Sequence, residues 1–199
     1  KVVAEGGNVG VSQLGRVEYA LAGGAINTDF IDNSAGVDCS DHEVNIKIAL
    51  NLAVETGKIT MDQRNKLLSD MTDQVRDLVL EDNHDQHLAI TITTLSSAFD
   101  TESFSQLIKD LEKNKLLDSK VEFLPTKTEL ARRSALGQGY TRPELAILLS
   151  YSKMALEFDL LESKITKDKY FDEHLVKYFP QMMQQDFRDV ILQHPLRHE

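Results

Sequence analysis

The chain has 199 residues, of which 41% are hydrophobic and 27% charged, a composition typical of a globular protein with one large domain or two small ones. Its net charge of -10 argues against a nucleic-acid partner, because phosphate binding requires a basic surface. No apolar run approaches the roughly 18 residues that cross a bilayer, and the single cysteine favours a reducing setting, so we expect a cytoplasmic protein without a membrane partner.

The first forty residues alternate short apolar runs with two loops rich in glycine and asparagine. Residues 2–4 predict a short buried strand before the first loop, residues 5–12. Residues 11–22 carry apolar side chains one turn apart and predict a helix that Gly23 and Gly24 end. Residues 25–31 predict a second strand before the second loop, residues 32–40. Strand, glycine loop, helix and strand is the typical order of an α/β nucleotide-binding fold.

Beyond residue 40 the pattern is helical throughout. Ser40-Asp-His-Glu43 matches a capping box and predicts a helix over residues 41–55, ended by Gly57. Thr141-Arg-Pro-Glu144 is a second capping box in front of an apolar stripe. Further helices are predicted from residue 60, over 71–97, 101–115 and 126–136, and as a pair within 169–193 that is split at Phe179-Pro180. In the 71–97 helix we expect Leu88, Ile92 and Leu95 on the apolar face.

The two loops are the first candidate site. Gly allows a ligand to approach the main chain closely, and the side chains of Asn8 and Asn33 offer both a donor and an acceptor. The alternative is that both segments are only strand-to-helix turns. Neither contains Gly-x-Gly-x-x-Gly, so the phosphate-binding fingerprint of dinucleotide-binding folds is not in this chain.

Other polar groupings have simpler explanations. Cys39 and His42 have a metal-like spacing, but zinc needs further ligands, so we expect no metal and a small buried cysteine. His84 and His87 with nearby aspartates favour a solvated helix face over a cation site. No catalytic triad is recognisable. At the predicted start of the 41–55 helix, Ser40 caps the helix, and the free amides there favour a carboxylate.

Several segments together resemble one enzyme family. They are Val2-Val-Ala-Glu-Gly-Gly-Asn8, Gly15-Arg-Val-Glu-Tyr-Ala-Leu-Ala-Gly-Gly24, Ile26-Asn-Thr-Asp29, Ile31-Asp-Asn-Ser-Ala-Gly-Val-Asp-Cys-Ser-Asp-His-Glu-Val-Asn-Ile-Lys47, Gly139-Tyr-Thr-Arg-Pro-Glu-Leu-Ala146 and His194-Pro-Leu-Arg197. The chain closely resembles part of the large bacterial NAD-specific glutamate dehydrogenases. That resemblance implies reversible oxidative deamination of L-glutamate to 2-oxoglutarate and ammonia, with NAD as the hydride acceptor.

The resemblance also implies roles for the loop residues. The first loop is similar to the Glu-Gly-Ala-Asn loop near the nicotinamide ribose in the small glutamate dehydrogenases, which assigns Gly7, Asn8 and Ser12 to the cofactor. The second is similar to their Asn-Ala-Gly-Gly-Val segment followed by Ser, with Ala35 as a departure. Asn33 would then face the nicotinamide. For the substrate, the resemblance implies that Val37 and Ser40 receive the glutamate γ-carboxylate.

The expected fold is mostly α. Residues 1–40 would be the end of an α/β Rossmann-like NAD-binding domain, and residues 41–199 an all-helical C-terminal domain. Because the chain starts at Lys1 inside an expected strand, we expect a segment of a longer polypeptide. The resemblance implies that the family's catalytic Lys and Asp lie upstream, so we expect no activity in the isolated segment. The full-length enzyme is expected to be a homo-oligomer. The alternative is a non-catalytic helical module for oligomerisation or regulation.

Overall fold

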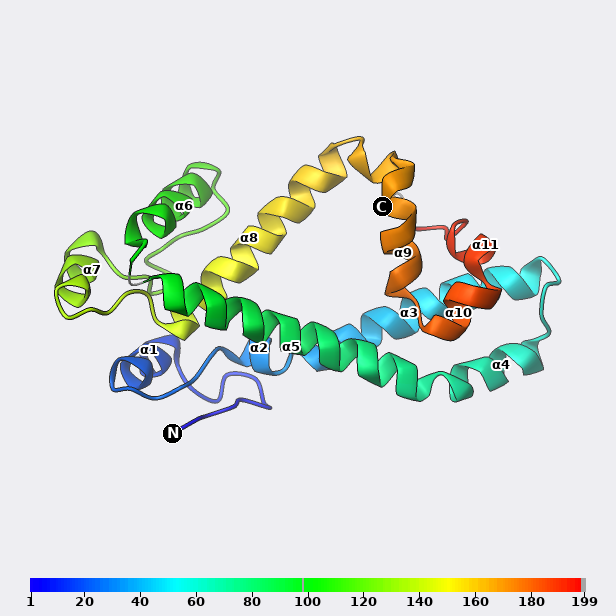
Figure 1. The fold of residues 1–199 in the computed structure, drawn as a ribbon, viewed down its shortest axis with the longest axis horizontal. Coiled ribbons are helices and arrows are strands. Elements are labelled where there is room, and N and C mark those ends of the chain that lie inside the picture. The colour runs from blue at the N-terminus through cyan, green and yellow to red at the C-terminus, as the bar shows by residue number, and fades with distance from the viewer. Residues whose placement is uncertain (98, 198–199) are drawn as a thin grey trace. The chain divides into compact units, whose positions relative to one another are not determined.

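The computed structural model describes residues 1–97 and 99–197, which are mostly helical (Figure 1). None of the described helices is long and apolar enough to cross a bilayer. The helices are α1 Gln13–Leu21, α2 Asp29–Asp32, α3 Ser34–Glu55, α4 Met61–Asp70, α5 Thr72–Ser97, α6 Thr101–Lys113, α7 Lys127–Ser134, α8 Arg142–Glu162, α9 Asp172–Tyr178, α10 Gln181–Asp186 and α11 Arg188–Ile191, with 3-10 turns η1 Ile165–Lys167 and η2 Lys169–Phe171.

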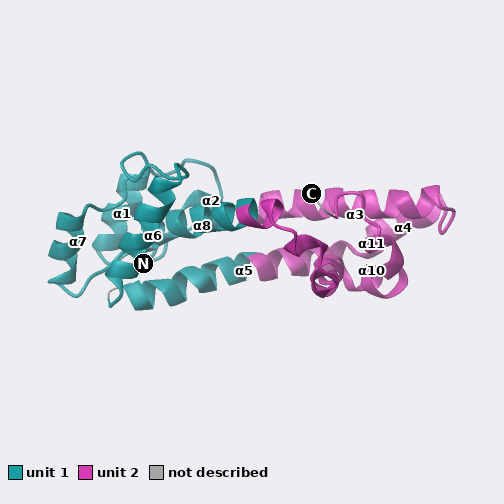
Figure 2. Ribbon diagram, turned by 90° about the horizontal axis from the view of Figure 1, so that it is seen from above, with its two compact units in different colours: residues 1–34, 83–158 teal, residues 35–82, 159–199 magenta. Residues whose placement is uncertain are grey.

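The chain divides into two compact units, coloured separately in Figure 2. The first unit comprises residues 1–34 and 83–158, and the second comprises residues 35–82 and 159–199. Because the chain passes between the units more than once, three helices (α3, α5 and α8) contribute residues to both. The two units are therefore not consecutive stretches of sequence.

The N-terminal part of the first unit is only partly as expected. Val2 and Ala25 form a parallel bridge, in which the Val3 amide donates to the Ala25 carbonyl over 2.9 Å, but no longer strand occurs among the described residues. The predicted strand over residues 25–31 is wrong from residue 29, where α2 begins. The Asp29 carboxylate accepts from the next backbone amide, and acidic side chains favour the start of a helix. The helix predicted over 11–22 is confirmed as α1.

The core of the first unit is an apolar cluster of α6, α7 and α8, which includes Leu111, Leu130 and Leu148. Half of the second predicted capping box is present at the start of α8: the Thr141 amide donates to Glu144 Oε2 over 2.7 Å, while the Thr141 hydroxyl donates to the same oxygen over 2.8 Å. Leu88, Ile92 and Leu95 of α5, expected on an apolar face, are instead exposed, while Ile90 is buried. Because a helix of this length packs against different elements along its course, one line of apolar residues in its sequence does not identify the side that is buried.

The core of the second unit packs α3 against the short C-terminal helices α9 to α11 (Figure 1). Leu50 and Ala53 of α3 contact this cluster together with Phe179 and Met183, all nearly inaccessible to solvent. The predicted break at Phe179-Pro180 is confirmed, because α9 ends at Tyr178 and α10 begins at Gln181. Residues 169–193 were expected to form two helices, but they contain η2, α9, α10 and α11.

The start of α3 differs from the prediction. The helix begins at Ser34, not after residue 40, so Ser40 lies inside α3 and its predicted capping box is wrong. Between these positions the sequence has one Gly and no Pro, so nothing prevents the helix from starting early. In the first unit, the Ser34 hydroxyl also accepts hydrogen bonds from Asn83 at 2.8 Å and Gln86 at 3.2 Å. These contacts from α5 fix the earlier start.

Candidate functional site

The first Gly/Asn loop is held on α1 by a buried ion pair. Arg16 donates through Nε to Glu5 Oε2 over 2.6 Å and through Nη2 to Glu5 Oε1 over 3.0 Å. Both side chains are at most 8% exposed. Glu5 Oε1 also accepts from the Val11 amide at 3.0 Å, so one carboxylate bonds both α1 and the far end of its own loop.

Asp29 extends this pair to the tip of the loop. Its carboxylate lies 3.2 Å from Arg16 Nη2 and accepts from the Val9 amide at 2.6 Å. Val9 has a φ of 57°, an uncommon conformation for a β-branched residue, and this hydrogen bond helps to hold it. Burial would raise the pKa of Asp29, but the Val9 amide and the Arg16 charge outweigh it, so the pKa is lowered. The carboxylate is therefore held in its charged form.

Asp32 connects the two loops. Its carboxylate accepts from the Glu5 amide at 2.9 Å and from Asn27 Nδ2 at 2.9 Å, and lies 3.0 Å from His87 Nε2 of α5. Arg142, at the start of α8, donates to Asn27 Oδ1 over 2.9 Å. Burial lowers the pKa of Arg142, and the charge of Asp32 opposes that effect. His87 of α5 and Arg142 of α8 thus contact the residues that hold the loops.

The structure brings together two of the predicted cofactor residues. Asn33 Nδ2 donates to Asn8 Oδ1 over 3.0 Å, and this pair joins the two loops at an exposed position. Gly7, beside Asn8, is exposed, and a Cβ added there would meet nothing within 4 Å. Ser12 is the N-cap of α1, where its hydroxyl accepts from the Gly15 amide over 3.2 Å.

The two predicted substrate residues belong to the second unit. Val37 and Ser40 lie one turn apart on α3; the Val37 side chain is 69% exposed, and the Ser40 hydroxyl donates to the Gly36 carbonyl over 3.4 Å. Since Ser40 is inside the helix, neighbouring amides are used in backbone hydrogen bonds, and the argument that free amides there attract a carboxylate is wrong.

Sequence reasoning missed the residues that support these loops. The sequence pattern predicts a strand at Asp29 and a solvated helix face at His87, whereas Asp29 begins α2 and His87 contacts Asp32. The opposite charges of Glu5 and Arg16 flank a glycine loop, and that pattern was an available signal for the ion pair. The expectation of a buried Cys39 is also wrong, because this cysteine is exposed.

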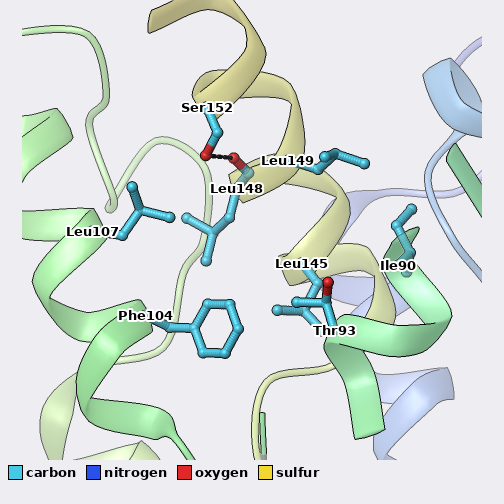
Figure 3. A pocket seen from close by; sticks show the side chains of 8 residues that line it. All are labelled: Ile90, Thr93, Phe104, Leu107, Leu145, Leu148, Leu149 and Ser152. Carbon is cyan, nitrogen blue, oxygen red and sulfur yellow. Dashed lines mark hydrogen bonds between the residues drawn. The ribbon is translucent and has the colours of Figure 1, made fainter. Parts of the chain in front are cut away.

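An apolar cavity of about 170 Å³ lies in the first unit among α5, α6 and α8 (Figure 3). Phe104, Leu107 and Leu148 line it, together with two hydroxyl side chains. These hydroxyls, of Thr93 and Ser152, donate to carbonyls of their own helices at 2.6 and 2.7 Å. The cavity therefore lacks free polar groups that would orient a ligand, and the loop cluster is the better candidate site.

Two family models match this chain. The first is described as the catalytic domain of bacterial NAD-glutamate dehydrogenase and matches residues 1–93, which include both loops. The second is described as the C-terminal region of glutamate dehydrogenase and matches residues 137–199. The first match therefore spans both loops, and the second spans α8 to α11.

Curated relatives are similar over all 199 residues. NAD-specific glutamate dehydrogenases from Pseudomonas aeruginosa, Halomonas elongata and Mycobacterium tuberculosis are 48%, 44% and 44% identical to the chain. The chain spans 12% of the length of each. It belongs to the family of large bacterial NAD-specific glutamate dehydrogenases.

Proposed function

We propose that this chain forms the nicotinamide-facing wall of the active site in an NAD-dependent glutamate dehydrogenase. The enzyme would convert L-glutamate to 2-oxoglutarate and ammonia and pass the hydride to NAD. The observation that carries the proposal is the hydrogen bond between Asn8 and Asn33, the two asparagines that the resemblance assigns to the cofactor. The role of a purely structural helical module is not favoured, because residues 1–93 match a catalytic-domain model.

The Asn8–Asn33 pair has the chemistry that a nicotinamide carboxamide needs. Their mutual bond uses the amide group of Asn33 and the carbonyl oxygen of Asn8. Asn33 Oδ1 remains as an acceptor and Asn8 Nδ2 as a donor, and neither has another partner among the described side-chain hydrogen bonds. A carboxamide presents one NH₂ donor and one carbonyl acceptor, so it complements this pair. Gly7 leaves room for the ring to approach.

The buried network behind the pair would position it. Glu5, Arg16, Asp29 and Asp32 fix both loops through charge-assisted hydrogen bonds, which are stronger than neutral ones. A site held in this way loses less conformational entropy when it binds a ligand. We assign these four residues a positioning role, because none is placed against the cofactor itself.

We also propose the domain boundaries expected from the sequence. Residues 1–40 would complete a Rossmann-like NAD-binding domain, and residues 41–199 would form the helical C-terminal domain. The parallel bridge between Val2 and Ala25 supports the first part, since parallel pairing across an intervening helix is the pattern of a βαβ unit. On α3, Val37 and Ser40 would contact the glutamate γ-carboxylate by side chain alone. A homo-oligomer remains our proposal for the full-length enzyme.

Steady-state kinetics of the intact enzyme with Asn33→Ala test the cofactor assignment. We expect KM for NAD to rise about tenfold, the effect of losing roughly one well-formed hydrogen bond. Asn65→Ala is the matched control, because Asn65 is an exposed asparagine of α4. Unchanged KM and kcat in Asn33→Ala would remove Asn33 from the site.

A further inference from the structure

A group of three potential metal ligands lies in the second unit, between α3 and the first part of α5. Asp38 and His42 are four residues apart on α3, and Asp82 comes from α5. One ligand atom from each lies within 4.8 Å of the other two. His42 Nε2 is 3.8 Å from Asp38 Oδ1 and 3.7 Å from Asp82 Oδ2.

The histidine in this cluster is buried without a hydrogen-bond partner. Its side chain is 1% exposed, and neither ring nitrogen has a partner among the described residues. A buried polar group without a partner costs free energy, so such a group calls for an explanation. Its Nε2 atom is almost equally far from an oxygen of each carboxylate.

The orientation of the His42 ring is fixed by stacking. The ring of Tyr178 lies parallel to it, with centroids 4.4 Å apart and an angle of 15° between the planes. Tyr178 is itself held by Asn45, which donates to its hydroxyl over 3.2 Å. The imidazole therefore cannot turn away from the carboxylates without breaking this stack.

The electrostatics of the cluster favour a cation. No Lys or Arg is paired with Asp38 or Asp82 among the described ion pairs, and Asp38 Oδ2 is a buried atom without a partner. One oxygen of each of these two carboxylates lies within 4.8 Å of the other. These carboxylates therefore repel one another in the absence of a counter-charge.

A protonated His42 is the alternative counter-charge, but the distances favour a metal. Charge-assisted hydrogen bonds are typically about 2.7–2.9 Å long, whereas both nitrogen–oxygen distances exceed 3.5 Å. Ligand atoms about 2.1 Å from a tetrahedral ion lie roughly 3.4 Å apart, so the two nitrogen–oxygen distances need only a small contraction to hold one.

We propose that Asp38, His42 and Asp82 bind a divalent metal ion of the zinc class, with His42 Nε2 and one oxygen of each carboxylate as ligands. Imidazole and carboxylate are both ordinary ligands of Zn²⁺, whereas Mg²⁺ prefers a full octahedron of oxygens. The ion connects α3 to α5 within the second unit. It also lies on the helix that carries Val37 and Ser40.

Zinc binding to the intact polypeptide tests the proposal. Protein stripped with a chelator and dialysed is titrated with Zn²⁺ against a competing chromophoric chelator, and bound zinc is counted by mass spectrometry. The test variant is Asp82→Asn, because the Asp82 side chain is 59% exposed and its replacement leaves the core intact. Asp85→Asn, an exposed aspartate of the same helix, is the matched control.

We expect wild type and Asp85→Asn to bind one more zinc ion per chain than Asp82→Asn, or to bind that ion at least tenfold more tightly. Asp38→Asn should lose the same ion, and Co²⁺ bound at the site should show a visible absorption that both ligand variants lack. Equal zinc content and affinity in wild type, Asp82→Asn and Asp85→Asn would overturn the proposal. The proposal would also be overturned if wild type retained no more zinc than Asp82→Asn.

Discussion

The buried Glu5–Arg16 pair gives the sharpest test of how the first loop is held. Glu5→Gln leaves the Arg16 guanidinium buried with Asp29 as its remaining carboxylate, at 3.2 Å. Removing one partner of a buried ion pair typically costs about 3–5 kcal/mol. Because Asp29 remains and the glutamine oxygen can still accept, we expect a loss of about 2–3 kcal/mol in the local stability of the loop.

Hydrogen–deuterium exchange of the intact protein measures this local stability directly. A loss of about 2–3 kcal/mol predicts that amides in residues 5–12 exchange about 30- to 140-fold faster, since 1.4 kcal/mol is a factor of ten. Glu18→Gln, an exposed glutamate of α1, should leave the exchange unchanged. Less than threefold acceleration in Glu5→Gln would refute the idea that the ion pair holds the loop.

Two further predictions concern the substrate side and acid stability. Ser40→Ala in the intact enzyme should raise KM for glutamate by about tenfold with little change in KM for NAD; an unchanged glutamate KM would exclude Ser40 from the pocket. The pKa of Asp29 is lowered in the folded state, so its contribution to stability is complete above the ordinary carboxyl pKa of about 3.9 and is lost as pH falls through the lowered value. The stability difference between wild type and Asp29→Asn, from urea unfolding followed by circular dichroism, should therefore shrink as the pH falls below about 4, and a constant difference would contradict this assignment.

Local signals in the sequence predicted most helix ends. Thr60 stands at the N-cap of α4, where a helix is predicted to start, and Ser12 is the N-cap of α1; each accepts a hydrogen bond from an amide of the following first turn. Gly23, with a φ of 88°, follows the end of α1. Such ends depend on residues within one turn of each other, which is why they can be read from sequence.

Contacts between distant residues account for the errors. Ser34 and Ser40 are both plausible helix starts, and the choice depends on Asn83 and Gln86, which lie far along the chain. In the same way, Asp82 approaches His42 only in the folded protein, so the spacing of Cys39 and His42 gives no sign of this group. The two segments predicted as strands, residues 2–4 and 25–31, pair only through the single bridge between Val2 and Ala25.

The resemblance predicts that Asn8 and Asn33 contact the cofactor, and the structure adds the hydrogen bond between them. The resemblance did not identify the carboxylates that support the loops, because similar loop residues carry no information about the side chains packed against them. Asp32 is one of them, and its three partners come from well-separated positions.

A double-mutant cycle on the cofactor kinetics of the intact enzyme tests the central claim most directly. The four proteins are wild type, Asn8→Ala, Asn33→Ala and the double variant, compared by KM for NAD. If the two asparagines bind the carboxamide as a unit, each single change raises KM and the double change adds little more. Strictly additive effects, or no effect of either change, would contradict the claim that this pair faces the nicotinamide.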